Sequence, residues 1–319
     1  MTRSLSTCDR GCPVRKPKSR GRRRAEQAVV SRIAAGCSWL VQRLSLRAAR
    51  RLADGAAWVI MGLFRERQRL AEASIAAAFP EFTATEVRRV RRESVRNICR
   101  TMVELLKLPS LTPDEMLALT DTTAMPGLRD ALASGRGTIC VSAHFGNWEW
   151  LGALLGAGPV PAHFVARDAP HSVTARIINE ARASHGMHVI GREDLRTMLS
   201  VLRSGETLGI VPDQHALEGG VLLDFLGRPA WTFTGPALLA MRTGARVIPA
   251  FCPRLPDGTF RVEVLPEVEM ADTGDRDADL LTNTQRINTA IEQIIRKYPG
   301  QWLWMHDRWK GAPPTSATE

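Results

Sequence analysis

The sequence predicts an α/β fold in which helices flank a partly parallel, mixed sheet, with an additional layer of helices at the N-terminus. Two observations carry this prediction. Short runs rich in β-branched and aromatic residues begin at about residue 137, and helical patterns fall between several of them. Before that point, residues 25–107 show helical patterning alone.

We expect three helices over residues 25–107. The third begins at Thr83, because Thr83 and Glu86 have the spacing of a capping box. Another helix begins at Thr112, which is followed by Pro113 at the first helical position.

The remaining elements follow from residue 137 onward. The expected strands are Thr138–Ala143, His163–Val165, Thr207–Val211, Arg246–Phe251 and Phe260–Leu265. The expected helices are Val173–Ser184, Leu195–Arg203, Thr234–Arg242 and, as the last, Thr282–Lys297. A basic segment rich in tryptophan follows at Gln301–Lys310.

Composition limits the class of protein. Of the 319 residues, 44% are hydrophobic and 24% charged, which excludes a wholly disordered, collagen-like or polytopic membrane protein. The net charge of +10 is uneven, since residues 1–105 hold 23 basic and 9 acidic side chains and residues 106–319 hold 20 and 24. A basic region indicates nucleic acid or an anionic membrane as partner. Residues 1–38 lack the interleaved aromatic side chains of base-stacking proteins, so we expect a membrane surface and no nucleic acid.

The N-terminal third has no stretch of about 18–20 uncharged apolar residues that could span a bilayer. Its best apolar segments, Ile33–Gln42 and Leu52–Phe64, are short and flanked by arginines. Each contains a tryptophan, and we expect both to lie at a membrane interface. Packing against the core of the protein itself is the alternative.

We therefore divide the chain into a basic disordered tail (1–24), a helical membrane-associating region (25–107), an α/β core (108–310) and a flexible tail (311–319). The basic start lacks the apolar run of a secretory signal. The six cysteines do not form a disulfide framework, which favours a reduced protein that faces the cytoplasm. No His-x-His or His-Glu-x-x-His grouping is present, so we expect no metal site.

The strongest chemical feature is the run Ala143-His-Phe-Gly-Asn-Trp-Glu149. An apolar strand places His144 at its carboxyl end, the usual position of functional groups in open α/β sheets. Gly146 permits a tight turn, and Glu149 begins a helix. An imidazole beside a carboxylate is the general-base part of a catalytic triad, here without a protein nucleophile.

The spacing itself is weak evidence, because three of the seven histidines match H-x4-[DE]. His163 lies inside an apolar run, and His188 lies before a polar stretch. Only His144 has a strand, a turn with glycine and a helix start in order. A histidine capped by a nearby acid is the structural alternative.

Residues 70–310 resemble the bacterial lipid A biosynthesis (lauroyl/myristoyl) acyltransferases, which belong to the wider H-x4-[DE] lysophospholipid acyltransferases. Five blocks carry the resemblance in order: Ala76–Glu81, His144–Glu149, Pro212–Gln214, Phe225–Ala230 and Gln301–Lys310. The resemblance implies a glycerolipid acyltransferase-like fold. It also implies transfer of an acyl chain from an acyl carrier protein or coenzyme A thioester to a lipid hydroxyl, with no further cofactor.

The resemblance further assigns roles to single residues. His144 would remove the proton of the acceptor hydroxyl, and Glu149 would hold the imidazole in the correct tautomer. Arg182 and Asp213 would join the site. The remaining substrate-binding candidates are Arg167, Gln214, His306, Arg308 and Lys310. A surface or strand-end role is the alternative for the arginines, and core or interfacial packing is the alternative for the tryptophans.

Two features depart from the family pattern. The N-terminal segment is weakly apolar, which favours peripheral attachment to the cytoplasmic face of the inner membrane. The run Ala166-Arg-Asp-Ala-Pro170 replaces the usual Tyr-Arg-Pro followed by Asn-Pro, so the acceptor can differ from a lipid A precursor. The alternative acceptors are a phosphatidylinositol mannoside, an aminoacyl lipid or a lysophospholipid. A catalytically inactive membrane or nucleic-acid adaptor is the remaining alternative.

Overall fold

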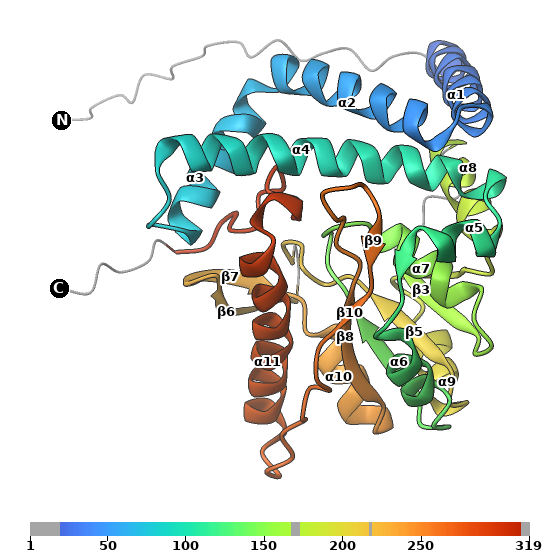
Figure 1. Ribbon diagram of the computed structural model, residues 1–319. Coiled ribbons are helices and arrows are strands. Elements are labelled where there is room, and N and C mark those ends of the chain that lie inside the picture. The colour runs from blue at the N-terminus through green and yellow to red at the C-terminus, as the bar shows by residue number, and fades with distance from the viewer. Residues whose placement is uncertain (1–19, 167–172, 217–218, 314–319) are drawn as a thin grey trace, which may run out of the picture.

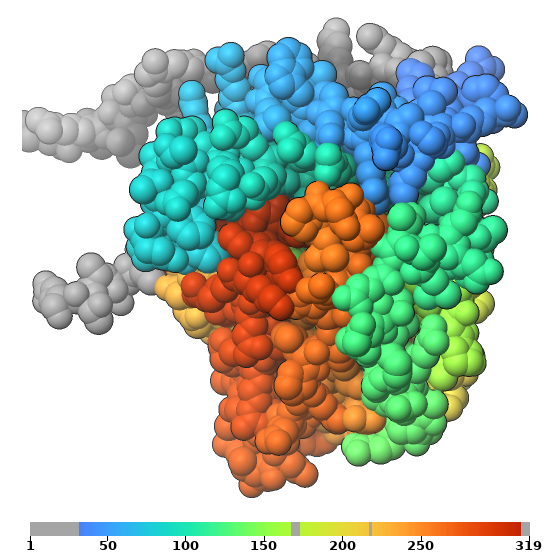
Figure 2. Space-filling model, viewed as in Figure 1, coloured from blue at the N-terminus to red at the C-terminus, as the bar shows by residue number. Residues whose placement is uncertain are grey.

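The computed structural model describes residues 20–166, 173–216 and 219–313, with the backbone alone for residues 20–31. Four helices form a layer over one end of the molecule (Figures 1 and 2): α1 (Arg20–Arg43), α2 (Leu46–Leu63), α3 (Arg65–Ala78) and α4 (Ala84–Lys107). The expectation of three helices here was wrong. Ser45 caps a new helix by accepting a hydrogen bond from Ala48 N, and Phe64 separates α2 from α3.

Both predicted helix starts, at Thr83 and at Thr112, are confirmed, and each carries a capping box. Thr83 begins α4, where its side chain and that of Glu86 bond each other's backbone N–H groups. Thr112 and Glu115 do the same at α5 (Pro113–Ala118). Helix α4 packs against α2 and contacts the segment 299–310, which we call the closing segment.

A six-stranded sheet forms the centre of the molecule, in the order β10-β8-β2-β5-β3-β4. Its strands are β2 (Thr138–Val141), β3 (Ala162–Ala166), β4 (His188–Gly191), β5 (Thr207–Ile210), β8 (Arg246–Phe251) and β10 (Glu263–Val264). All neighbouring pairs are parallel except β10 with β8. The predicted mixed, mostly parallel sheet is therefore confirmed.

Several short strands escaped prediction. The run Phe260–Leu265 contains two strands, because β9 (Phe260–Arg261) pairs with β1 (Thr120–Asp121) before β10 joins the main sheet. The strand β4 and the hairpin of β6 (Val221–Phe225) and β7 (Arg228–Thr232) were also not expected.

Helices cover both faces of the sheet (Figure 1). The helices α6 (Met125–Leu132), α7 (Trp148–Gly156) and α8 (Val173–Ala183) belong to one face, and α9 (Leu195–Arg203), α10 (Gly235–Thr243) and α11 (Arg276–Lys297) to the other. Successive residues of β2 enter opposite layers: Ile139 and Val141 join one core and Cys140 the other. Burial on both faces explains why β2 reads as a continuous apolar run.

The helix α11 begins at Arg276, six residues before the expected start, because Asp275 caps it. Two 3-10 helices, η1 (Leu108–Ser110) and η2 (Pro299–Gln301), complete the elements. No helix in the described part of the chain is long and apolar enough to cross a membrane.

Candidate active site

The candidate site lies at the carboxyl edge of the sheet, beside the first turn of α7. His144 follows β2, and Asp213 follows β5, which is the neighbouring strand. Since both strands run parallel, their carboxyl ends bring these two side chains together. The proximity of His144 and Asp213 is thus a consequence of strand order, although 69 residues separate them.

The turn that carries His144 is tightly enclosed. Gly146 has a φ of 56°, in the left-handed region, and a Cβ atom there would lie 2.3 Å from the carbonyl oxygen of Cys252. Asn147 ends the turn and caps α7 by accepting a hydrogen bond from Trp150 N at 2.9 Å. The geometry therefore requires glycine at position 146 and a side chain that can cap the helix at position 147.

Asp213 holds the imidazole of His144. Its Oδ1 lies 2.7 Å from Nδ1 of His144, and its Oδ2 accepts hydrogen bonds from His144 N at 2.9 Å and from Trp302 Nε1 at 2.7 Å. The Asp213 side chain is 1% exposed, whereas that of His144 is 24% exposed and faces the pocket. The amide of Gln214 lies 3.3 Å from the other ring nitrogen, Nε2.

These contacts determine the charge state of the pair. Burial alone would lower the pKa of His144, but the charge and hydrogen bond of Asp213 outweigh it, and the pKa is raised. Burial would raise the pKa of Asp213, but the charge of His144 and the three hydrogen bonds lower it. Asp213 therefore remains a carboxylate that accepts a hydrogen bond from the Nδ1 proton, which leaves Nε2 of the neutral ring unprotonated, in contact with the Gln214 amide.

Glu149 occupies a different position from the one that the motif predicts. Its carboxylate accepts hydrogen bonds from Nε and Nη2 of Arg182 at 2.9 and 2.6 Å and from Trp148 Nε1 at 2.9 Å. The carboxylate hydrogen-bonded to the imidazole is that of Asp213. Glu149 begins α7 after the Asn147 cap, so it meets Arg182 of α8, and it acts on His144 only as a nearby charge that raises the pKa.

The other predicted residues differ in their position relative to the pocket. Gln214 and Arg182 line the pocket. His306 accepts a hydrogen bond from His215 N at 3.0 Å, and its own pKa is lowered by burial. Arg308 is 0% exposed and donates to Trp231 O and Thr232 Oγ1, which is a structural rather than a ligand-facing position.

Two predicted residues are not placed in the site. Lys310 is exposed on the closing segment. Arg167 lies outside the described residues.

A pocket of about 840 Å³ opens at the His144–Asp213 pair. The polar side chains that line it include those of His144, Trp148, Glu149, Asn179, Arg182, Arg192, Glu193, Gln214 and His215. The rest of the lining is largely apolar and includes Cys140, Leu151, Gly152, Leu155, Phe164, Ile178 and Met187. The size and lining are typical of a site for an apolar ligand that is oriented by a few polar groups.

No protein nucleophile is coupled to the imidazole within the described residues. Cys140 lines the pocket, but burial raises the pKa of its thiol to about 12, so the thiol stays protonated. Ser142 also lines the pocket, but the two ring nitrogens of His144 contact Asp213 and Gln214. The arrangement can remove a proton from an external acceptor rather than form a covalent acyl-enzyme.

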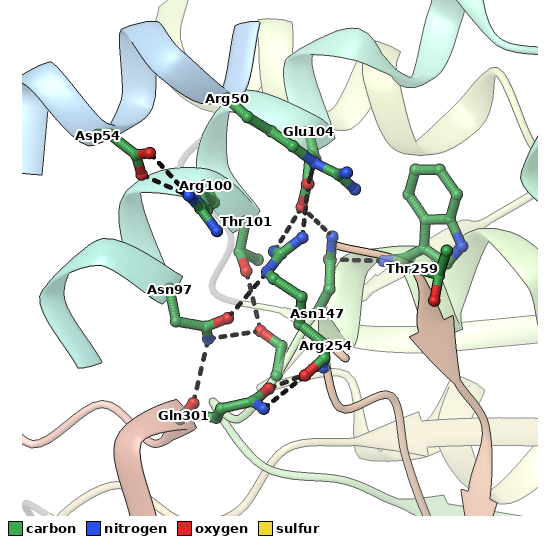
Figure 3. A network of polar contacts seen from close by, with 12 residues as sticks. Arg50, Asp54, Asn97, Arg100, Thr101, Glu104, Asn147, Arg254, Thr259 and Gln301 are labelled. Carbon is green, nitrogen blue, oxygen red and sulfur yellow. Dashed lines mark hydrogen bonds and ion pairs between the residues drawn. The ribbon is translucent and has the colours of Figure 1, made fainter. Parts of the chain in front are cut away.

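Sequence reasoning missed Glu104 and Arg254, which lie directly behind the turn (Figure 3). Both Nη atoms of Arg254 donate to the Glu104 carboxylate at 2.7 Å, and Asn147 Nδ2 donates to Glu104 Oε2 at 2.7 Å. A usable signal was present, because Glu104 shares the inward face of an amphipathic helix with Asn97 and Thr101, at spacings of three and four.

A histidine–carboxylate pair at the carboxyl edge of an α/β sheet, beside a pocket, is typical of an enzyme that uses the imidazole as a general base. The family model described as bacterial lipid A biosynthesis acyltransferase matches residues 16–311, and the chain belongs to that family. It is an acyltransferase.

Curated relatives agree with this assignment. The chain is 27% identical over 282 residues to the "Lipid A biosynthesis lauroyltransferase" of Escherichia coli K12, covering 87% of this chain and 90% of the relative. It is 27% identical over 224 residues to the "Phosphatidylinositol mannoside acyltransferase" of Mycolicibacterium smegmatis, covering 68% and 71%. It is 26% identical over 254 residues to the "Lipid A biosynthesis palmitoleoyltransferase" of E. coli K12, covering 78% and 80%.

Proposed function

We propose that the enzyme transfers a fatty acyl chain from a thioester of acyl carrier protein or coenzyme A to a hydroxyl group of a lipid A precursor or related membrane glycolipid. The observation that carries this proposal is the His144–Asp213 pair, whose imidazole lines a pocket with a partly apolar lining. The apolar part of the lining suits an acyl chain, and the unprotonated Nε2 suits an acceptor hydroxyl that displaces the Gln214 amide.

The proposed chemistry is direct. Nε2 of His144 removes the hydroxyl proton while the oxygen attacks the thioester carbonyl carbon, and Asp213 stabilises the resulting imidazolium. The tetrahedral intermediate then expels the thiolate, which takes the proton back from His144, so the products are an ester and a free thiol. Among the described residues, Nη1 of Arg182 makes one long hydrogen bond, to Asn179 at 3.4 Å, and we assign it as a donor to the oxyanion.

In this proposal Glu149 fixes Arg182 rather than His144. Its carboxylate is 3% exposed and holds two of the Arg182 nitrogens, which aligns the guanidinium beside the pocket. Both H-x4-E residues therefore serve one reaction, with different partners.

The acceptor has a second candidate. The identity to the phosphatidylinositol mannoside acyltransferase equals the identity to the lauroyltransferase, at 27%. The test is to incubate the purified enzyme with acyl carrier protein and coenzyme A thioesters and with both glycolipid acceptors, followed by mass spectrometry of the lipids. Acylation of neither acceptor by either donor would contradict the proposal.

We also propose that the enzyme attaches peripherally to the cytoplasmic face of the inner membrane through α1, α2 and Phe64. Large apolar side chains are exposed there: Ile33, Trp39, Leu40, Leu52, Trp58, Val59, Leu63 and Phe64. Trp58 is 76% exposed and Leu63 72%, and Arg43 stacks on Trp39 at 4.5 Å. Exposed aromatic residues among arginines suit anionic headgroups, where each charge contributes about 1 kcal/mol.

Vesicle flotation tests the membrane surface. The wild type should float with vesicles that contain anionic lipid, and a Trp58→Ser/Leu63→Ser variant should lose most of this binding. Leu222→Ser is the matched control, because Leu222 is an exposed leucine on the β6–β7 hairpin, 39% exposed and distant in sequence from these helices. Equal flotation of all three proteins would contradict the proposed surface.

A further inference from the structure

A stripe of polar side chains runs along the buried face of α4. Ser94, Asn97, Thr101 and Glu104 are spaced by three, four and three residues, so they lie on one face of the helix. All four are at most 5% exposed. We call these four residues the polar stripe. A polar face on a buried helix is costly unless each group is hydrogen-bonded, so its partners indicate its purpose.

Two members of the polar stripe hold the carbonyl of Gly146. Asn97 Nδ2 and Thr101 Oγ1 each donate to Gly146 O at 2.8 Å (Figure 3). These two bonds occupy both lone pairs of a carbonyl located two residues after His144. The carbonyl of Gly146, the residue with the positive φ, is therefore held by side chains of α4.

Glu104 fixes the next residue. Its carboxylate is 0% exposed and accepts from Asn147 Nδ2 at 2.7 Å, from Arg254 at 2.7 Å through two nitrogens, and from Arg50 Nε at 2.6 Å. The two cations offset the desolvation of the carboxylate, which a single hydrogen bond would not do. The other end of the Asn147 amide caps α7, the helix that begins with Trp148 and Glu149.

The remaining groups of the turn are bonded to the same surroundings. Gly146 N donates to Gln301 O at 3.0 Å, Asn147 N donates to Cys252 O at 2.8 Å, and Leu303 N donates to His144 O at 3.1 Å. Asn97 also donates to Gln301 O at 3.1 Å. The turn is therefore held on one side by the polar stripe and on the other by the closing segment and the end of β8.

We propose that the polar stripe of α4, with Glu104 as its principal member, is a positioning platform that sets the place of His144 for proton transfer. This inference rests on the proposed function of His144 as a base. Glu104 does not line the pocket, so it acts through Asn147 and Gly146. A displacement of about 1 Å in a reacting group lowers a rate by roughly a hundredfold, so a loss of this support should reduce kcat.

The test is a double-mutant cycle on Glu104→Gln and Asn147→Ser. In Glu104→Gln, the side-chain NH2 group faces N–H donors of Arg50, Asn147 or Arg254, so part of the hydrogen bonding of the carboxylate is lost. The Ser hydroxyl still caps α7 but is too short to reach Glu104. Each single variant should lower kcat by about ten- to a hundredfold and leave KM for the acyl donor within about threefold. The double variant should lose less than the product of the two single losses, because both variants remove the Glu104–Asn147 hydrogen bond.

Asp54→Asn is the matched control. Asp54 and Arg100 form a two-bonded ion pair at 2.7 Å between the same helices, α2 and α4, but touch no residue of the turn. This variant should keep wild-type kcat. If Glu104→Gln does not fold, Thr101→Val provides the milder test, since it removes one bond to Gly146 O without changing charge. We expect Thr101→Val to lower kcat by about threefold to tenfold.

Hydrogen–deuterium exchange of the segment 143–152 provides a readout that does not need activity. Exchange there should be faster in Glu104→Gln and unchanged in Asp54→Asn. The inference is overturned if the folded Glu104→Gln variant keeps kcat within twofold, if the cycle is additive, or if Asp54→Asn slows the enzyme equally. A wild type without acyl transfer would refute the proposed function, and the exchange pattern alone would then decide whether the platform holds the turn.

Discussion

The replacement Asp213→Asn tests the role of the histidine–aspartate pair, because the neighbours of Asp213 dictate how the amide must orient. Oδ2 of Asp213 accepts from two N–H groups, His144 N and Trp302 Nε1. The amide oxygen of an asparagine must therefore occupy this position, and its NH2 group must point at Nδ1 of His144. An NH2 donor at Nδ1 places the ring proton on Nε2, where the acceptor hydroxyl needs a base.

The expected loss follows from this tautomer. A positioned general base contributes about 10²–10⁴ in rate, and an aspartate that selects the tautomer of a catalytic histidine contributes about 10⁴ in the serine proteases. We expect kcat of Asp213→Asn to fall by about 10³, which equals about 4 kcal/mol of activation free energy. Loss of the negative charge should also lower the pKa of His144, since Asp213 is what raises it.

The assay is steady-state acyl transfer followed by mass spectrometry, with kcat measured across pH. Glu206→Gln is the matched control, because Glu206 contacts His163 Nε2 at 2.7 Å in a pair that does not line the pocket. It should retain wild-type kcat. An Asp213→Asn enzyme within tenfold of the wild type, with an unshifted pH profile, would refute the assignment of the pair.

Three further predictions concern charge, stability and chain length. The wild-type kcat/KM should fall at acidic pH with an apparent pKa above 6.5, because Asp213 raises the pKa of His144 and the reaction needs neutral His144; a midpoint below 6.5 would contradict this. Arg182→Met leaves the buried Glu149 unpaired and should lower the free energy of unfolding by about 3–5 kcal/mol in urea titration. Adding Glu149→Gln should restore part of that loss, and no recovery would argue against the pair. Gly209→Ala puts a Cβ 2.5 Å from Phe164 Cδ1 in the pocket wall, and donor competition should show roughly a fourfold shift toward shorter chains for each methylene excluded.

The central sheet could be predicted because its strands are short, apolar and separated by helices. The bounds of β8 agree with prediction, and those of β2, β3 and β5 differ by one or two residues. The strand β4 was missed because its burial is low, with His188 exposed at its start. A strand is recognised in the sequence by apolar residues that become buried, and β4, at the edge of the sheet, buries few.

The residues of the candidate site could be predicted from the sequence, but which carboxylate contacts His144 could not. His144, Glu149, Arg182 and Asp213 all carry recognisable signals, but H-x4-E spacing says nothing of which carboxylate reaches Nδ1. That depends on β5 lying next to β2, which is a property of sheet order. Arg308 was predicted to bind substrate because it belongs to a family motif. Its side chain is instead buried and donates to Trp231 O and Thr232 Oγ1.

The arginines of the N-terminal region lie in two different environments, which the net charge cannot distinguish. Arg50, Arg91 and Arg100 turn toward Glu104, Glu72 and Asp54, and so they use acids of the same region. Arg43, Arg47 and Arg51 are exposed beside the apolar side chains of α1 and α2. The first three arginines are therefore paired with carboxylates of the same region, whereas the other three face solvent. The same helices can therefore support the catalytic turn on their inner face and offer a cationic, apolar surface to anionic lipid on the outer one.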